Sequence, residues 1–134
     1  MNIKKEWPPN INELRSYFDF DGFKPVFAWG SILYNPSGDE IPIDLELHEA
    51  VHSQQQKQFS SVEFWWKKYV LDRVFRLEME LEAYSKQLEF IKKHTNAKIA
   101  KQALEDFSTT LSSKLYNLDL TKERSSTLIR LWSK

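Results

Sequence analysis

Cysteine is absent from the 134 residues of the chain. Disulfide bonds and thiolate metal ligands are therefore excluded, and any metal site must use histidine and carboxylate side chains. An excess of charge is also absent, because 19 basic and 19 acidic residues give a formal net charge of zero. Without a long-range electric field, we expect neither nucleic acid nor an anionic membrane as a partner.

Long apolar runs are missing as well. The chain holds no stretch near the roughly 20 apolar residues that a membrane-spanning helix needs, and its N-terminal Met-Asn-Ile-Lys-Lys lacks the apolar core of a signal peptide. We therefore expect a cytoplasmic protein. The composition, 41% hydrophobic and 28% charged, predicts one globular domain over residues 1–134. No sequence pattern fixes its oligomeric state.

The most informative stretch is His48-Glu49-Ala50-Val51-His52. Residues four apart share one face of a helix, so the two imidazoles can converge on one point, as half of a tetrahedral zinc site. Glu49 then lies beside the metal, where the glutamate of an H-E-x-x-H motif acts as general base. The alternative is a surface helix whose two histidines are merely solvated.

The N-terminal third of the chain predicts irregular structure followed by β-structure. Residues 1–24 contain a Pro-Pro pair and offer at most one short helix. Residues 25–43 predict a β-hairpin, made of one strand at 25–34 and a brief return strand at 41–43, with Gly30 as a bulge or a point of close approach in the first strand.

Helices are expected in the rest of the chain. Residues 44–94 predict the metal-site helices, of which the first is capped by Asp44 and the second opens at a Ser60–Glu63 capping box. Residues 95–134 predict two C-terminal helices. From Val70 on, a heptad-like apolar stripe predicts a long amphipathic helix, which Asp72-Arg73 either interrupts or lets continue. The stripe is formed by Val70, Val74, Leu77, Leu81, Tyr84, Leu88 and Ile91. The expected fold class is α+β, mainly helical, with the hairpin over the H-E-x-x-H helix.

A catalytic zinc site needs a third protein ligand, and the long helix carries three glutamates that could supply it. At ~100° per residue, Glu80 lies roughly 70° from the centre of the apolar stripe. By the same count Glu78 lies about 90° away and Glu82 about 130° away. Glu80 is therefore the carboxylate best placed to face a neighbouring helix, whereas Glu82 points toward solvent.

The spacing His48-Glu-x-x-His52 followed by Glu80-x-x-Ala83 resembles that of the gluzincins. These are zinc metallopeptidases with two histidines and one glutamate as ligands, and the short chain is similar to their minigluzincin branch. Residues 25–90 also resemble small, poorly characterised metallopeptidase-like proteins of phages and bacteria, through Tyr34-Asn-Pro-Ser-Gly-Asp-Glu-Ile-Pro, Trp65-Trp66-x-x-Tyr69 and Phe75-Arg-Leu-Glu. This similarity is compatible with a phage-encoded origin.

The resemblance implies a site and a way of binding substrate. It implies one zinc ion held by His48, His52 and Glu80, with Glu49 as general base. It also implies that a strand above the metal helix pairs with an extended peptide, through Phe27, Ala28, Trp29, Gly30 and Ser31. Family patterns of this type often end in Glu-x-x-Ala-Asp, with an aspartate that orients a ligand, but here Tyr84 stands in its place.

We therefore predict a zinc-dependent endopeptidase that acts on a peptide or protein substrate. Tyr69, Tyr84 and Tyr116 are the candidates for stabilising an oxyanion or supporting a ligand, and no pattern selects among them. The glutamines at 54–56 are expected on a solvated helix face, and the alternative is that one of them bonds the carboxylate of a ligand. Two other functions fit the same residues, namely a zinc-stabilised binding or virion module and a peptidase-like regulator that binds peptides and cleaves poorly.

Overall fold

The computed structural model describes residues 2–133 and is mainly helical with one small sheet, which confirms the expected α+β class. The elements in chain order are β1 (Asn2–Lys4), α1 (Ile11–Tyr17), β2 (Phe27–Trp29), β3 (Ile32–Tyr34), α2 (Ile43–Gln56), α3 (Val62–Leu71), α4 (Arg73–His94), α5 (Ala97–Leu111) and α6 (Lys122–Trp132). Within residues 2–133, none of the helices combines the length and the apolar character needed to cross a membrane.

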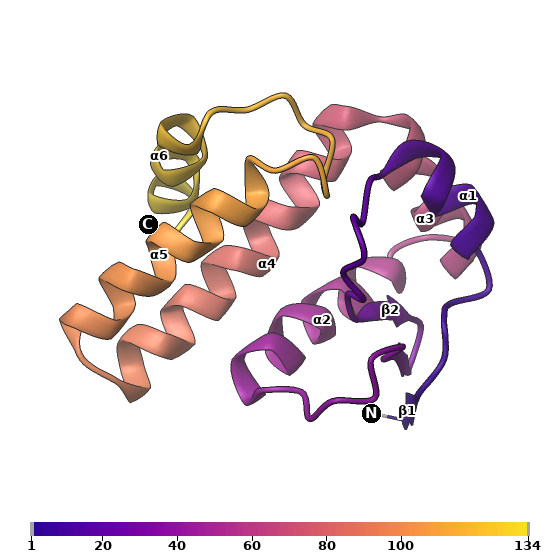
Figure 1. Ribbon diagram of the computed structural model, residues 1–134, viewed down its shortest axis with the longest axis horizontal. Coiled ribbons are helices and arrows are strands. Elements are labelled where there is room, and N and C mark those ends of the chain that lie inside the picture. The colour runs from indigo at the N-terminus through magenta and orange to yellow at the C-terminus, as the bar shows by residue number, and fades with distance from the viewer. Residues whose placement is uncertain (1, 134) are drawn as a thin grey trace.

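Helix α4 is the central element of the fold. It packs against α2 and α3 on one side and against α5 and α6 on the other, and Figure 1 shows it running between α2 and α5. The sheet and α1 lie on the α2 side, far from α6. A residue on α4 can therefore face either the N-terminal or the C-terminal half of the molecule, depending on its position around the helix.

The sheet differs from the expected hairpin. Its strand order is β1-β3-β2, with β1 parallel to β3 and β2 antiparallel to it. The predicted single strand at 25–34 is wrong, because Gly30 forms the hairpin turn and is not a bulge. Gly30 has φ +61°, which suits the glycine that opens a two-residue hairpin turn. Residues 41–43 do not pair back, and β1, from the segment expected to be irregular, adds the third strand.

Two helix starts also differ from expectation, and a third decides between the alternatives left open at Asp72-Arg73. Asp44 does not cap α2, whose N-cap is Pro42. The cap of α3 is Ser61, whose hydroxyl accepts a hydrogen bond from the Phe64 amide at 3.2 Å. Asp72 both ends α3 and caps α4 through the Phe75 amide, so the long predicted stripe is broken there. Val74, placed on that stripe by periodicity, is 66% exposed.

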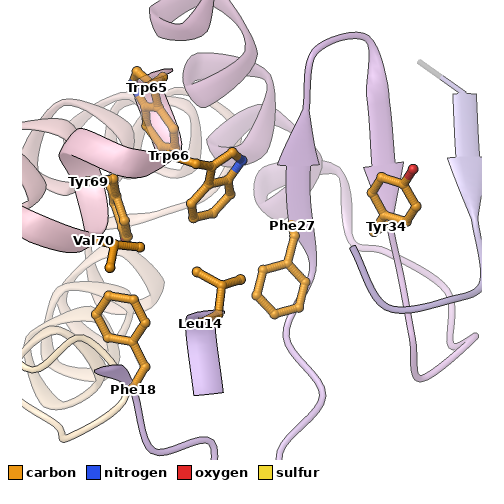
Figure 2. Packing of buried hydrophobic residues seen from close by; sticks show 8 residues of the cluster. All are labelled: Leu14, Phe18, Phe27, Tyr34, Trp65, Trp66, Tyr69 and Val70. Carbon is orange, nitrogen blue, oxygen red and sulfur yellow. The ribbon is translucent and has the colours of Figure 1, made fainter. Parts of the chain in front are cut away.

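Two apolar clusters flank α4. One lies between α1, the sheet and α3, and the other lies between α4, α5 and α6. Figure 2 shows part of the first cluster, with Leu14 between Phe18 and Phe27 and with Trp66 facing them from α3. The two halves are joined by Arg76, a buried residue at the start of α4. Its guanidinium donates to the carbonyls of Tyr69, Val70, Tyr116 and Asn117 at 2.7–3.1 Å.

Candidate metal centre

Two neighbouring helices bring the three predicted ligands together. His48 and His52 lie one turn apart on α2, and Glu80 faces them from α4, as the stripe geometry predicts. Glu80 Oε1 lies 3.1 Å from His48 Nε2, and Glu80 Oε2 lies 3.1 Å from His52 Nε2. All three residues are buried, with 2%, 5% and 2% of their surface exposed for His48, His52 and Glu80. These residues form a group that could hold a metal ion.

The spacing of the group fits a tetrahedrally coordinated metal ion. One potential ligand atom from each residue lies within 4.8 Å of the other two. Two atoms that each lie about 2.0 Å from a tetrahedral ion are separated by about 3.3 Å, close to the observed nitrogen–oxygen distances. Two imidazoles and one carboxylate are also a ligand set that zinc accepts in catalytic sites.

The electrostatics of the site also favour a cation. Burial alone would lower the pKa of His52, but the negative charge of Glu80 and its hydrogen bond outweigh burial and raise that pKa to about 9. Burial alone would raise the pKa of Glu80, but the charge of His52 and hydrogen bonds from both histidines lower it well below its ordinary range. Glu80 is thus a carboxylate at neutral pH that attracts positive charge, whether a proton or a metal ion.

A second layer of polar side chains surrounds the two histidines. His48 Nδ1 contacts Gln87 Oε1 at 2.9 Å, and His52 Nδ1 contacts Gln55 Oε1 at 2.8 Å. Gln87 Nε2 then donates to the carboxylate of Asp44 at 2.7 Å. Gln55 Nε2 donates to a carboxylate as well, because Glu82 Oε1 lies 3.0 Å away.

These contacts correct two sequence predictions. Glu82 was expected to point to solvent, but it is half-buried and bonded to Gln55. Of the three glutamines expected on a solvated face, Gln54 is exposed while Gln55 and Gln56 are buried. The back of α2 is thus packed against other elements, and its glutamines take part in the site.

Glu49 is buried and lines a cavity together with two members of the group, His52 and Glu80. The cavity has an empty volume of about 490 Å³ including its open part, and Glu49, His52 and Glu80 form its polar end. Burial raises the pKa of Glu49, although the charges of His52 and His48 oppose this effect. The other walls are mostly apolar and come from Leu14, Phe18, Phe20, Pro25, Val26, Phe27, Trp65, Trp66, Tyr69, Leu115 and Tyr116.

The N-terminal segment supplies part of the cavity wall. Leu14 from α1, Phe18 at the C-cap of that helix and Phe20 just after it form one side of the cavity. The opposite side comes from α3 and includes Trp65 and Trp66, both of which are buried. Residues of the 1–24 segment therefore line the approach to Glu49.

The structure separates the three candidate tyrosines. Tyr69 donates its hydroxyl to Glu80 Oε2 at 2.5 Å, so it supports a metal ligand. The ring of Tyr84 packs edge-on against that of His48, with centroids 4.4 Å apart, and Tyr84 does not line the cavity. Tyr116 lines the cavity, and its hydroxyl lies 2.8 Å from that of Tyr84. Tyr116 is thus the candidate that both lines the cavity and has a hydroxyl not bonded to Glu80.

The outer edge of β2 is already bonded within the chain. Gln56 Nε2 donates to the Ala28 carbonyl at 2.9 Å, and Gln56 Oε1 accepts from the Gly30 amide at 2.7 Å. Trp66 Nε1 also donates to the Ala28 carbonyl at 3.1 Å. A peptide could pair with residues 28–30, as the resemblance implies, only by displacing Gln56. The extended segment before β2 lies at the cavity, where Pro25 and Val26 form part of the wall.

Sequence reasoning missed four residues that shape the site, namely Gln55, Gln56, Gln87 and Arg76. Helix periodicity carried a signal for three of them. Gln55 and Gln56 follow His52 by three and four residues, and Gln87 follows Glu80 by seven, so each shares a helix face with a ligand. Arg76 gave no such signal, because its partners lie on α3 and on the loop after α5.

Comparison of the chain with family models, curated protein sequences and solved structures gave no match in any of the three. A function for this chain therefore has to be argued from its own geometry.

Proposed function

We propose that this protein is a zinc-dependent endopeptidase whose metal ligands are His48, His52 and Glu80. The observation that carries the proposal is the position of Glu49, next to a buried two-histidine, one-glutamate set and at the polar end of a cavity. Zinc bound by these residues would polarise a peptide carbonyl and lower the pKa of a water molecule to around 7.

In this proposal Glu49 takes a proton from the attacking water and passes it to the leaving amine. Its buried carboxylate has a raised pKa, which brings the base closer to the neutral range in which it works. The nearly closed surroundings of Glu49 exclude bulk water, which strengthens electrostatic interactions at the reacting carbonyl.

Tyr116 is the residue proposed to stabilise the oxyanion that forms on the carbonyl. Burial raises the pKa of its phenol, so the hydroxyl keeps a proton that it can donate. Its loop is held in place by Arg76, which binds the carbonyls of Tyr116 and Asn117 at 2.9 Å each. Tyr84 fixes the direction of the Tyr116 hydroxyl from the other side.

A second function is favoured by one specific observation, the burial of the whole ligand set. His48, His52 and Glu80 are each at most 5% exposed, which also suits an ion that stabilises the fold of a binding or structural module. In that case Glu49 has no proton to transfer, and its replacement leaves the behaviour of the metal-loaded protein unchanged.

The deciding experiment compares Glu49→Gln with wild type. Zinc content, expected at about one ion per chain, is measured with hydrolysis of an unfolded protein substrate. Glu49→Gln should keep the zinc and lose at least about 100-fold of the hydrolysis rate, because glutamine cannot accept the proton. Glu46→Gln makes the same change three residues earlier on α2 and serves as the control. Zinc binding without any turnover in wild type would support the structural module.

A further inference from the structure

Two glutamines hold the two metal-site histidines in the same way. Gln87 Oε1 lies 2.9 Å from His48 Nδ1, and Gln55 Oε1 lies 2.8 Å from His52 Nδ1. All four residues are buried, so water does not compete for these contacts. An amide oxygen can only accept a hydrogen bond, and the ring nitrogen that faces it must therefore donate one.

A carboxylate behind each glutamine sets the orientation of its amide. Gln87 Nε2 donates to Asp44 Oδ2 at 2.7 Å, and Gln55 Nε2 donates to Glu82 Oε1 at 3.0 Å. An ionised carboxylate offers only acceptors, so turning either amide over would bring two oxygens into contact. The carboxylates thus select the amide orientation in which oxygen faces histidine.

This orientation decides which ring nitrogen keeps a free lone pair. A neutral imidazole carries one N–H, and with that proton on Nδ1 the lone pair lies on Nε2. The Nε2 atoms of His48 and His52 both face Glu80, each at 3.1 Å from one carboxylate oxygen. Two nitrogen lone pairs and a carboxylate then converge, and such a set attracts a cation.

We propose that Gln87 with Asp44 and Gln55 with Glu82 are positioning pairs that keep both imidazoles in the tautomer that binds a metal through Nε2. The proposal rests on the metal site of the proposed function, but it requires no hydrolysis. Partners of this kind fix ring orientation, and their loss typically weakens metal binding 10–100-fold. In this proposal the two pairs orient the histidines without the aspartate that similar sequence patterns carry at this point, where the chain has Tyr84.

The two pairs differ in how strongly the orientation of the glutamine amide depends on its carboxylate partner. Gln55 Nε2 also donates to the Met79 carbonyl at 3.1 Å, so the amide keeps its orientation when Glu82 is changed. For Gln87 Nε2, Asp44 is the acceptor found among residues 2–133. Asp44→Ala should therefore weaken metal binding more than Glu82→Ala does.

The first test replaces three glutamines by methionine, each in a separate variant, and measures zinc affinity by competition with a chelator. Gln87→Met and Gln55→Met keep the length of the side chain but remove the acceptor for histidine. Gln54→Met makes the same change at an exposed position of α2. Zinc affinity should fall 10–100-fold in the first two variants and stay unchanged in the third. Wild-type affinity in both Gln87→Met and Gln55→Met would overturn the proposal.

A rescue experiment separates positioning from a general loss of structure. Combining Asp44→Asn with Gln87→Glu exchanges the positions of the carboxylate and the amide. The carboxylate at position 87 then accepts a hydrogen bond from His48, and the amide at position 44 donates one to that carboxylate. Zinc affinity should return to within about threefold of wild type, because the acceptor at Nδ1 is restored. A double variant that binds zinc no better than Gln87→Met would count against the pairs.

The last test does not depend on zinc. Nitrogen NMR of the metal-free protein at alkaline pH should place the proton of each neutral imidazole on Nδ1, the nitrogen that faces a glutamine oxygen. If wild type binds no zinc, the proposed function fails, while protons on Nδ1 still support the positioning pairs. Protons on Nε2 in wild type would overturn the pairs whatever the zinc result.

Discussion

The Tyr69 hydroxyl donates a hydrogen bond to Glu80 Oε2 at 2.5 Å. Burial raises the pKa of Tyr69, and the negative charge of Glu80 raises it further, so the phenol keeps its proton and remains a donor. Tyr69 comes from α3 and Glu80 from α4, on either side of the break at Asp72. The contact therefore links the turn between these helices to the orientation of a carboxylate in the candidate metal site.

The first prediction concerns the loss of the Tyr69 hydroxyl. Tyr69→Phe should keep the fold but weaken zinc binding by about tenfold, because Glu80 loses a partner that orients its carboxylate. Zinc titration against a chelator measures the effect, and circular dichroism checks the fold. Tyr17→Phe, at an exposed tyrosine of α1, is the control. Unchanged zinc affinity in Tyr69→Phe would show that Glu80 is held by its other contacts alone.

The second prediction concerns pH. The pKa of His52 is raised from 6.5 to about 9 in the folded, metal-free protein. Its protonated form therefore contributes stability that is fully present below pH 6.5 and is lost as the pH rises through about 9. Zinc must displace this proton, so zinc affinity should rise about tenfold per pH unit up to the raised pKa.

Thermal unfolding of the metal-free protein and zinc titration across a pH series measure these two effects. Glu80→Gln removes the charge that raises the His52 pKa, so both pH dependences should flatten in that variant. Its zinc affinity should also fall at least tenfold, since a ligand is lost. A pH dependence equal to that of wild type in Glu80→Gln would contradict the assigned cause.

The third prediction concerns Gln56, whose side-chain amide bonds the outer edge of β2. Gln56→Met should lower the free energy of unfolding by about 1–3 kcal/mol, because the Gly30 amide and the Ala28 carbonyl each lose a partner. Chemical denaturation measures the change. Gln54→Met should stay within about 0.5 kcal/mol of wild type, as expected for an exposed position. Similar stability for both variants would mean that water replaces Gln56 at no cost.

The fourth prediction concerns Arg76, whose guanidinium binds four carbonyls of α3 and of the loop after α5. Arg76→Lys should lower the free energy of unfolding by about 1–3 kcal/mol, because lysine keeps the charge but cannot satisfy these acceptors with a planar fork. Arg73→Lys, at the exposed first residue of α4, is the matched control. The denaturation midpoint should shift in the first variant only, and equal midpoints would contradict the role assigned to Arg76.

Local rules of helix geometry predicted much of the site. The four-residue spacing of His48 and His52 places both rings on one face of α2, whatever surrounds that helix. The angle of Glu80 from the apolar stripe predicted that it would face a neighbouring helix, and the structure confirms this contact. The same angle for Glu82 was misleading, because it says nothing about a partner such as Gln55 that reaches over from α2.

The sequence by itself determined which side chains could serve as ligands, the helical character of residues 44–94 and the shared helix face of His48 and His52, because these depend on neighbours within a few residues. Only the tertiary structure decided which side chains complete the site. Gln87 meets Asp44 across 43 positions of sequence, and Gln56 meets the Ala28 carbonyl across 28. Such contacts depend on how α2, α4 and the sheet pack together, and that packing comes from the apolar clusters of the whole chain.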